Sequence, residues 1–83
     1  MAKREIVIVA FPQAMAKACV IEDGLSVHEA MCWAPDIVPC LQSLRDNFMG
    51  IKKVVLMGPI SFIKNFEAPI KQHVGLPVEL KGM

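Results

Sequence analysis

Cys19 and His28 are the two residues of this sequence whose chemistry best suits catalysis. A cysteine thiol that hydrogen-bonds to an imidazole can act as a nucleophile. The turn at Asp23-Gly24 would bring these two side chains opposite each other in a hairpin. Both would lie in the middle of a strand, however, where no helix N-terminus activates the thiol and no oxyanion donors are evident. We therefore predict structural roles for both residues and expect no enzyme activity.

Cys32 adds a third possible metal ligand on the same predicted face as Cys19 and His28. Cys32 follows His28 by four residues, a separation of about 13 Å at about 3.3 Å per residue of strand. A zinc site holds its ligands within about 2.0–2.3 Å of one point and normally uses closely spaced cysteines, which this sequence lacks. We expect no metal and no cofactor. The odd number of cysteines predicts free thiols, as in the reducing cytosol.

The hairpin that carries these residues is the clearest structural signal in the chain. Two apolar segments, 14–22 and 25–33, flank Asp23-Gly24. A type I′ turn needs positive φ at both central residues, and Asp-Gly meets that need. The sequence therefore predicts two antiparallel strands joined by a two-residue turn.

A two-residue turn fixes which side chains share a face of the hairpin. The predicted inward face pairs Glu22 with Leu25, Val20 with Val27, Ala18 with Glu29 and Ala16 with Met31. The predicted outward face is mixed, and we take it as a candidate contact surface; it carries Met15, Lys17, Cys19 and Ile21 opposite Cys32, Ala30, His28 and Ser26. Glu29 is then a carboxylate on an apolar face, which must be solvated at the sheet margin, paired with Arg45 or Lys17, or functional.

Three further strands and two helices are predicted around this hairpin. Residues 5–11, 52–57 and 77–80 read as short strands rich in β-branched residues. A first helix begins after Asp36, follows an apolar stripe to Phe48 and ends at Gly50. Ser61 can cap a second helix, and Pro69 either kinks that helix or makes it restart at Glu67.

Eight residues are the candidates for binding: Lys17, Cys19, Ile21, His28 and Glu29 of the hairpin, together with Trp33, Gly58 and Ser61. Trp33 closes the hairpin and either covers the end of the core, which we favour, or is an exposed anchor for a partner. Gly58 and Ser61 lie between a strand end and a helix start, a position that suits anions. The glycine and lysine density of a phosphate-binding loop is absent, so a plain turn is the favoured interpretation.

The predicted element order, β-β-β-α-β-α-β, resembles the ribonuclease-H-like core that is also the half-domain of actin-like ATPases and sugar kinases. The segment from Ile51 to Leu80 (IKKVVLMGPISFIKNFEAPIKQHVGLPVEL) carries the resemblance most clearly. It implies an α+β fold with one mixed five-stranded sheet, in which an antiparallel meander is followed by two helix crossovers.

Two departures separate this chain from the active members of that family. The resemblance implies a metal-binding carboxylate in the first strand, where this chain has Ile8 and Ala10. It also implies an Asp-x-Gly phosphate loop after that strand, where the chain reads Phe11-Pro12-Gln13. We therefore expect a reduced version of the fold without the family's active site.

Length and composition favour a single domain, residues 1–83, that binds a protein. The chain is 54% hydrophobic, above the usual ~45–50%, so some apolar side chains should lie on the surface. Its net charge of +1 argues against nucleic acid as a partner. Neither a secretory signal nor a membrane span is evident. We expect a cytoplasmic, non-enzymatic interaction module that is a homo-oligomer or a subunit of a complex. The alternative is a degenerate domain that binds a nucleotide or nucleic acid near Gly58 and Lys52-Lys53.

Overall fold

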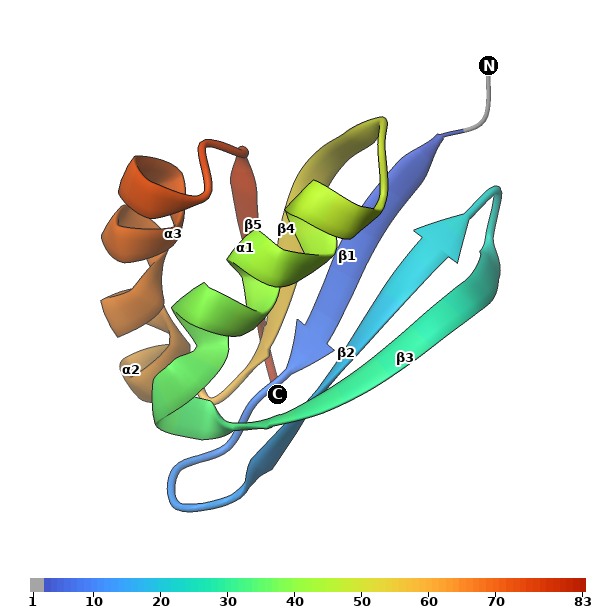
Figure 1. Cartoon of the computed structure of the whole chain (residues 1–83). Helices are drawn as coiled ribbons and strands as arrows, with labels where there is room; N and C mark the ends of the chain where they lie inside the picture. Colours follow the sequence, from blue (N-terminus) through green and yellow to red (C-terminus); the bar gives the residue numbers. More distant parts are fainter. Residues whose placement is uncertain (1–2) are drawn as a thin grey trace.

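The computed structural model describes residues 3–83 and contains one sheet with its helices on one side (Figure 1). The elements in chain order are β1 (Arg4–Val9), β2 (Met15–Glu22), β3 (Leu25–Trp33), the 3-10 turn η1 (Ala34–Asp36), α1 (Ile37–Asn47), β4 (Ile51–Gly58), α2 (Ile60–Ile63), the 3-10 turn η2 (Lys64–Phe66), α3 (Glu67–His73) and β5 (Val78–Gly82). This is the predicted order, with the second helix divided into three short pieces.

The sheet has five strands in the order β3-β2-β1-β4-β5. β1 and β2, and β2 and β3, pair antiparallel, whereas β4 is parallel to both β1 and β5. The two helix crossovers, from β3 to β4 and from β4 to β5, therefore run in the same direction across the sheet. Because crossovers between parallel strands are right-handed, two that move in the same direction place their helices on the same face.

The core lies between that face and the helices. Alternate residues of β1 and β4, which include Ile6, Ile8 and Leu56, are fully buried there. They belong to one apolar cluster with Leu41 of α1 and Ile70 of α3. The period of two along each strand sends the intervening side chains to the other face of the sheet, which no helix of residues 3–83 covers (Figure 1).

The β2–β3 hairpin has the predicted turn but a different register. Asp23 and Gly24 have φ values of 52° and 84°, as a type I′ turn requires. The register shifts between Val20 and Ile21, so Val20 pairs with His28 instead of Val27. Such a bulge inserts one extra residue into one strand. The predicted pairings after Ser26 are therefore wrong by one residue, and every β3 side chain from His28 onward faces the side opposite to that predicted.

The second helical segment confirms one of the two alternatives for Pro69. A 3-10 turn interrupts the helix and α3 restarts at Glu67, which puts Pro69 in a first turn, where its missing N–H costs nothing. The predicted cap at Ser61 is wrong: Pro59 occupies the N-cap position of α2, and no side chain makes a capping hydrogen bond.

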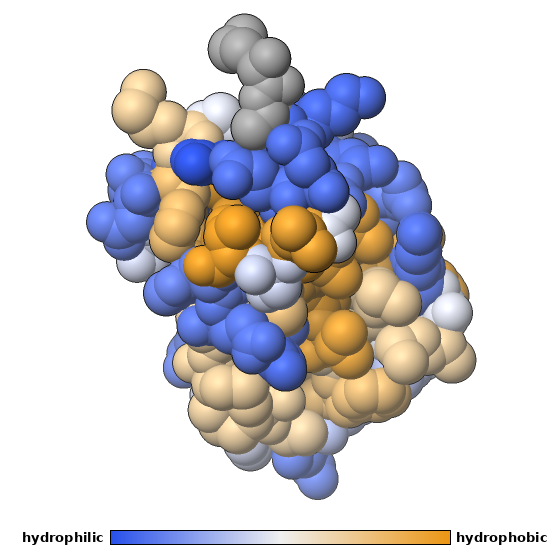
Figure 2. Space-filling view, turned by 90° about the vertical axis from the view of Figure 1, so that its right-hand side faces the viewer, coloured by the Kyte–Doolittle hydropathy of each residue, from blue (hydrophilic) through white to orange (hydrophobic). Residues whose placement is uncertain are grey.

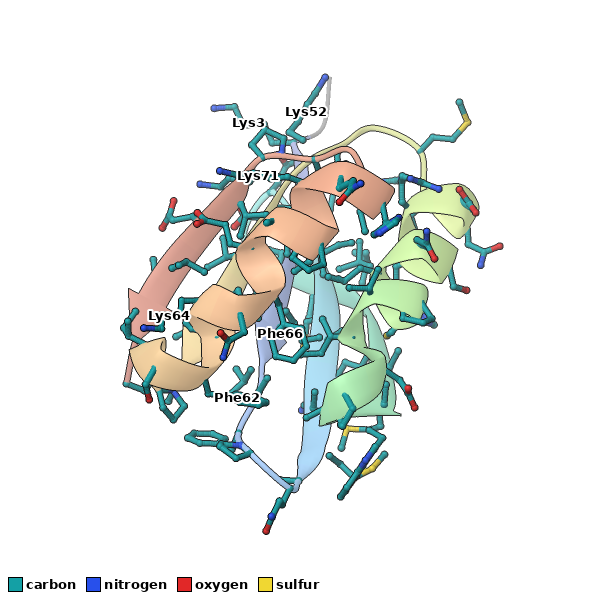
Figure 3. The ribbon with its side chains drawn as sticks, turned by 90° about the vertical axis from the view of Figure 1, so that its left-hand side faces the viewer. Lys3, Lys52, Phe62, Lys64, Phe66 and Lys71 are labelled. Carbon is teal, nitrogen blue, oxygen red and sulfur yellow. The ribbon has the colours of Figure 1, made fainter. Side chains whose placement is uncertain are left out.

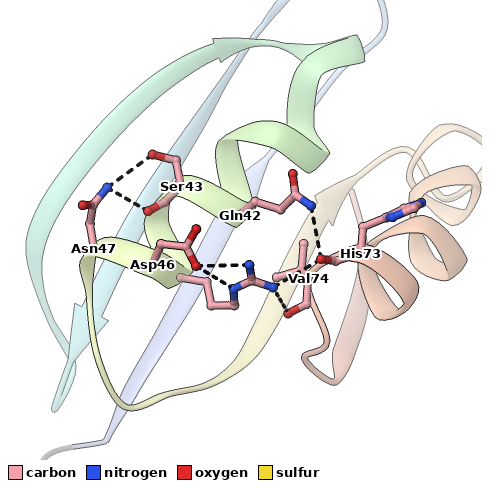
Figure 4. A network of polar contacts seen from close by, with 7 residues as sticks. Gln42, Ser43, Asp46, Asn47, His73 and Val74 are labelled. Carbon is pink, nitrogen blue, oxygen red and sulfur yellow. Dashed lines mark hydrogen bonds and ion pairs between the residues drawn. The ribbon is translucent and has the colours of Figure 1, made fainter.

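Arg45 joins α1 to the end of α3. Figure 4 shows the surrounding network of polar contacts, with Gln42, Asp46, His73 and Val74 labelled. Its Nη1 donates hydrogen bonds to the carbonyls of Val74, at 2.7 Å, and His73, at 3.2 Å. Gln42 Nε2 also donates to His73 O at 3.2 Å, and Asp46 holds the guanidinium at 3.1 Å. Carbonyls in the last turn of a helix have no intrahelical partner, so these bonds satisfy them from a neighbouring helix.

None of the helices in residues 3–83 has the length and apolar character needed to cross a membrane.

Candidate functional site

The uncovered side of the sheet, which we call the open face, is the surface with the most features of a binding site. The pairing registers and the alternation along each strand place on it Glu5, Val7 and Val9 of β1, Met15, Lys17, Cys19 and Ile21 of β2, Glu29, Met31 and Trp33 of β3, Lys53, Val55 and Met57 of β4, and Glu79 and Lys81 of β5. Figure 2 shows this side of the molecule, where apolar atoms run down the centre and hydrophilic residues lie above and beside them.

Apolar side chains occupy the middle of the open face and one of its ends. Val7, Val9 and Met57 lie side by side on neighbouring strands and are half-buried without any helix above them. At the end where β2 begins and β3 finishes, Met15 pairs with Trp33, and their side chains are 50% and 45% exposed. A contiguous apolar surface of this kind marks a contact site more often than isolated exposed residues do.

Trp33 is therefore an exposed residue, and the favoured prediction that it covers the core is wrong. The register shift explains the error in part, because Trp33 shares the open face with Met15 instead of turning toward the helices. Tryptophan beside a flexible methionine is a typical composition for a contact residue.

A charged cluster borders the open face along β4 and β5. Lys53 Nζ lies 3.1 Å from Glu79 and 3.8 Å from Glu5, and Lys81 Nζ lies 3.5 Å from Glu79. The hydrogen bond and charge of Glu79 raise the pKa of Lys53, and those of Lys53 lower the pKa of Glu79. This border is solvated and carries both signs of charge.

Glu29 lies on the opposite border and pairs with Lys17 at 3.2 Å, both side chains being 53% exposed. Two of the three alternatives for Glu29 hold together: it is solvated on the edge strand β3, and it pairs with Lys17. Its predicted place on the inward face is wrong, because the bulge moves it to the open face, where it needs no buried partner.

The predicted pairing of Cys19 with His28 is wrong for the same reason. Cys19 lies opposite Glu29 on the open face. His28 lies opposite Val20 on the helix side and packs against Phe48, with ring centroids 4.9 Å apart and ring planes tilted by 39°. A sheet separates the thiol from the imidazole, so they cannot form a nucleophile pair. Cys32 is also on the helix side, and within residues 3–83 no three His, Cys, Asp or Glu side chains are grouped so that they could hold a metal ion.

Five of the eight predicted binding residues share the open face, namely Lys17, Cys19, Ile21, Glu29 and Trp33. The prediction missed its centre, Val7, Val9 and Met57. A signal for them was available: the segment 6–11 is apolar at consecutive positions, which means that both faces of its strand are apolar.

Gly58 and Ser61 lie at the edge where β1 and β4 end. Gly58 has φ 150°, and a Cβ atom on it would lie 2.1 Å from the carbonyl oxygen of Ala10. Glycine is therefore required at this position by close packing of the two strand ends. Ser61 is exposed on the short helix α2 and makes no cap.

The two lysines predicted to face the same ligand as Gly58 lie at the other end of β4. Lys52 and Lys53 are at its start and Gly58 is its last residue, about 16–20 Å away at about 3.3 Å per residue. Figure 3 shows Lys52 beside Lys3 at one end of the molecule and Phe62 of α2 near the other. One ligand of nucleotide size cannot reach both places as predicted.

A shallow hollow of about 580 Å³ lies at the lysine end of the sheet. Its lining is mainly charged and consists of Lys3, Arg4, Glu5, Ile21, Asp23, Gly24, Lys52 and Lys53. Arg4 is held by Glu22 at 2.8 Å and Lys53 by Glu79, so part of its positive charge is already neutralised.

The sequence matches no protein-family profile and no curated protein. Two solved structures resemble the fold. One is the crystal structure of the Aquifex aeolicus member of the Ppx/GppA protein family, with a TM-score of 0.60 and 16% sequence identity. The other is a structural study of the Aquifex aeolicus PPX-GPPA enzyme, with a TM-score of 0.62 and 18% identity.

Both alignments cover 99% of this chain but only 36% of the chain to which it is compared. That family has the actin-like, ribonuclease-H-like fold, so the fold resemblance predicted from the element order is confirmed. At this level of identity the likeness concerns the fold alone.

Proposed function

We propose that this chain is a protein-binding module that pairs with a second copy of itself through the open face. The observation that carries the proposal is an uncovered sheet face with an apolar centre and an exposed Trp33–Met15 pair. Sheets with parallel strands normally have both faces covered, and β4 is parallel to each of its neighbours.

The charges on the open face favour a second copy as the partner. The face carries three acidic residues, Glu5, Glu29 and Glu79, and three basic residues, Lys17, Lys53 and Lys81. Both borders contain both signs, so a copy related by a twofold axis meets opposite charges without net repulsion. The arrangement of an apolar centre with a charged rim is that of a typical interface.

The size of the open face predicts a weak dimer. Five strands about 4.8 Å apart, with about seven residues each at about 3.3 Å, cover roughly 20 Å by 23 Å, a projected area of roughly 450 Å². Stable interfaces bury about 800 Å² on each partner, and weak ones less than about 600 Å². We expect a dissociation constant of about 10–100 µM.

Sedimentation equilibrium from about 5 µM to 1 mM protein tests the proposal. The double variant Met15→Lys/Trp33→Lys places two positive charges at the exposed apolar end of each copy, and we expect it to remain monomeric. Leu25→Lys is the matched control, because Leu25 is 72% exposed at the hairpin turn and lies outside the open face. A protein that is monomeric at 1 mM, or a double variant that dimerises as the wild type does, would refute the proposal.

A nucleotide site at the edge formed by the ends of β1 and β4 is the second candidate. The fold likeness to Ppx/GppA structures supports it, and ligands in sheets with parallel strands bind beyond the strands' carboxyl ends. Titration with ATP, followed by amide NMR shifts, tests it. Shifts confined to Gly58, Ile60 and Ser61 would support the site. Shifts at Lys3 and Lys52, or none at about 5 mM ATP, would exclude it.

A further inference from the structure

The outward backbone N–H and C=O groups of the edge strand β3 could pair with a further strand. β3 is nine residues long and the last strand on its side of the sheet, and no strand of residues 3–83 pairs with its outer side. After the bulge near Val27, the stretch from His28 to Trp33 pairs with β2 in regular register. Lysine and proline, which commonly protect edge strands, are absent from it.

A groove runs beside this edge on the helix side of the sheet, between β3 and α1. Its volume is about 630 Å³, within the range of sites that hold small ligands or several side chains. Ala30, Cys32 and Cys40, which are small and half-buried, line it together with Leu44. The rings of His28 and Phe48, which pack against each other, lie at one end.

The other end of the groove carries a negative charge. Asp36 lines the groove there, is exposed, and forms no ion pair among residues 3–83. Pro39 and Ser43 of α1 form the outer wall. The groove is therefore apolar in its middle, acidic at the end near Asp36 and bordered along its length by free backbone groups.

We propose that this groove binds an extended peptide segment, which pairs with residues 28–33 of β3 as a sixth strand and places alternate apolar side chains against Ala30, Cys32 and Cys40. A strand satisfies the free N–H and C=O groups of an edge and inserts every second side chain on the helix side. A basic residue of the peptide pairs with Asp36. The side chains that enter the groove do not contact the open face, because the groove and the open face lie on opposite sides of the sheet.

The native cysteines report on the two sites independently. Cys40 and Cys32 line the groove, whereas Cys19 is on the open face. Burial, the neighbouring Cys40 and then Asp36 raise the pKa of Cys32 to about 12. Because the thiolate is the reactive form, Cys32 should react slowly, and Cys40 is the reporter of groove occupancy.

Alkylation by iodoacetamide, measured for each cysteine by mass spectrometry, tests the proposal. The probe is a capped heptapeptide of alternating valine and threonine with one terminal arginine. At about 2 mM peptide we expect alkylation of Cys40 to slow by about threefold or more, with Cys19 unchanged. Ser43→Trp fills the groove from the exposed side of α1 and should abolish the dependence on peptide. The same peptide with proline at alternate positions cannot pair with β3 and should not protect Cys40.

Three results would overturn the assignment. Equal rates with and without the peptide would mean that the groove does not bind a strand. Protection of Cys19 alone would place the peptide on the open face. Protection of Cys40 by raised protein concentration without peptide would make a second copy the occupant of the edge. A failure of dimerisation through the open face would be seen separately, as an alkylation rate of Cys19 that does not depend on protein concentration.

Discussion

Replacement of Gly58 by alanine should be among the most destabilising single changes in this chain. A Cβ atom at this position would lie 2.1 Å from the Ala10 carbonyl oxygen and 3.0 Å from Cγ2 of Ile63. The first contact is with backbone, so one of the two strand ends must move. The two strand ends are also joined by a hydrogen bond of 2.9 Å, which Ala10 N donates to Met57 O. This bond resists the movement.

The expected cost of Gly58→Ala has two parts. A side chain at φ 150° costs about 1–3 kcal/mol in backbone strain. The overlap with Ala10 and Ile63 resembles overpacking of a core, which costs about 1–3 kcal/mol. Together they amount to about 2–6 kcal/mol, against a total of about 4–12 kcal/mol for a domain of this length.

Urea unfolding, followed by circular dichroism, measures this cost. Gly75→Ala is the matched control: Gly75 has φ 77°, and a Cβ atom there would meet nothing within 4 Å. It should lose only the backbone part, about 1–2 kcal/mol. We expect Gly58→Ala to lose about 1–3 kcal/mol more than the control, which is the overlap part. Equal losses would show that the strand ends are not closely packed and would return Gly58 to the candidate ligand-binding residues.

Two side-chain contacts and one absent cap give further expectations. Arg45→Met should cost about 1–3 kcal/mol in urea unfolding, because it leaves the carbonyl of Val74 without its donor at 2.7 Å. Lys53 lowers the pKa of Glu79, so the pair stabilises the fold at pH values above the ordinary pKa of a glutamate. This stabilisation is lost as the pH falls through the lowered pKa. Glu79→Gln should therefore make the melting temperature depend less on pH in the acid range. Ser61→Ala should change stability by less than about 0.5 kcal/mol, because Ser61 makes no capping hydrogen bond; a loss of 1 kcal/mol or more, about the worth of an N-cap, would show that it does.

Much of the fold follows from local patterns in the sequence. The turn at Asp23-Gly24, the five apolar strand segments and the helix from Ile37 were all predicted because each depends on neighbouring residues alone. The helix restart at Glu67 was one of two alternatives, since Pro69 excludes an uninterrupted helix but does not choose between a kink and a break.

The candidate site was predicted only in part. Lys17, Cys19 and Ile21 lie on the same side of β2 and were placed together correctly on a contact surface. His28 was placed there wrongly and Glu29 was wrongly excluded from it. The error arose because one inserted residue moves every later side chain of the strand to the other face of the sheet. The residues between Ser26 and His28 give no sign of the insertion.

The sequence by itself determined the element order, the hairpin turn and an excess of apolar residues, because these depend on composition and on short-range conformational preferences. Only the tertiary structure decided which faces those residues occupy. The bulge depends on how β3 pairs with β2, and the open face exists because both crossovers put their helices on one side of the sheet. Each is a property of contacts between segments distant in the chain, so local sequence preferences cannot specify them.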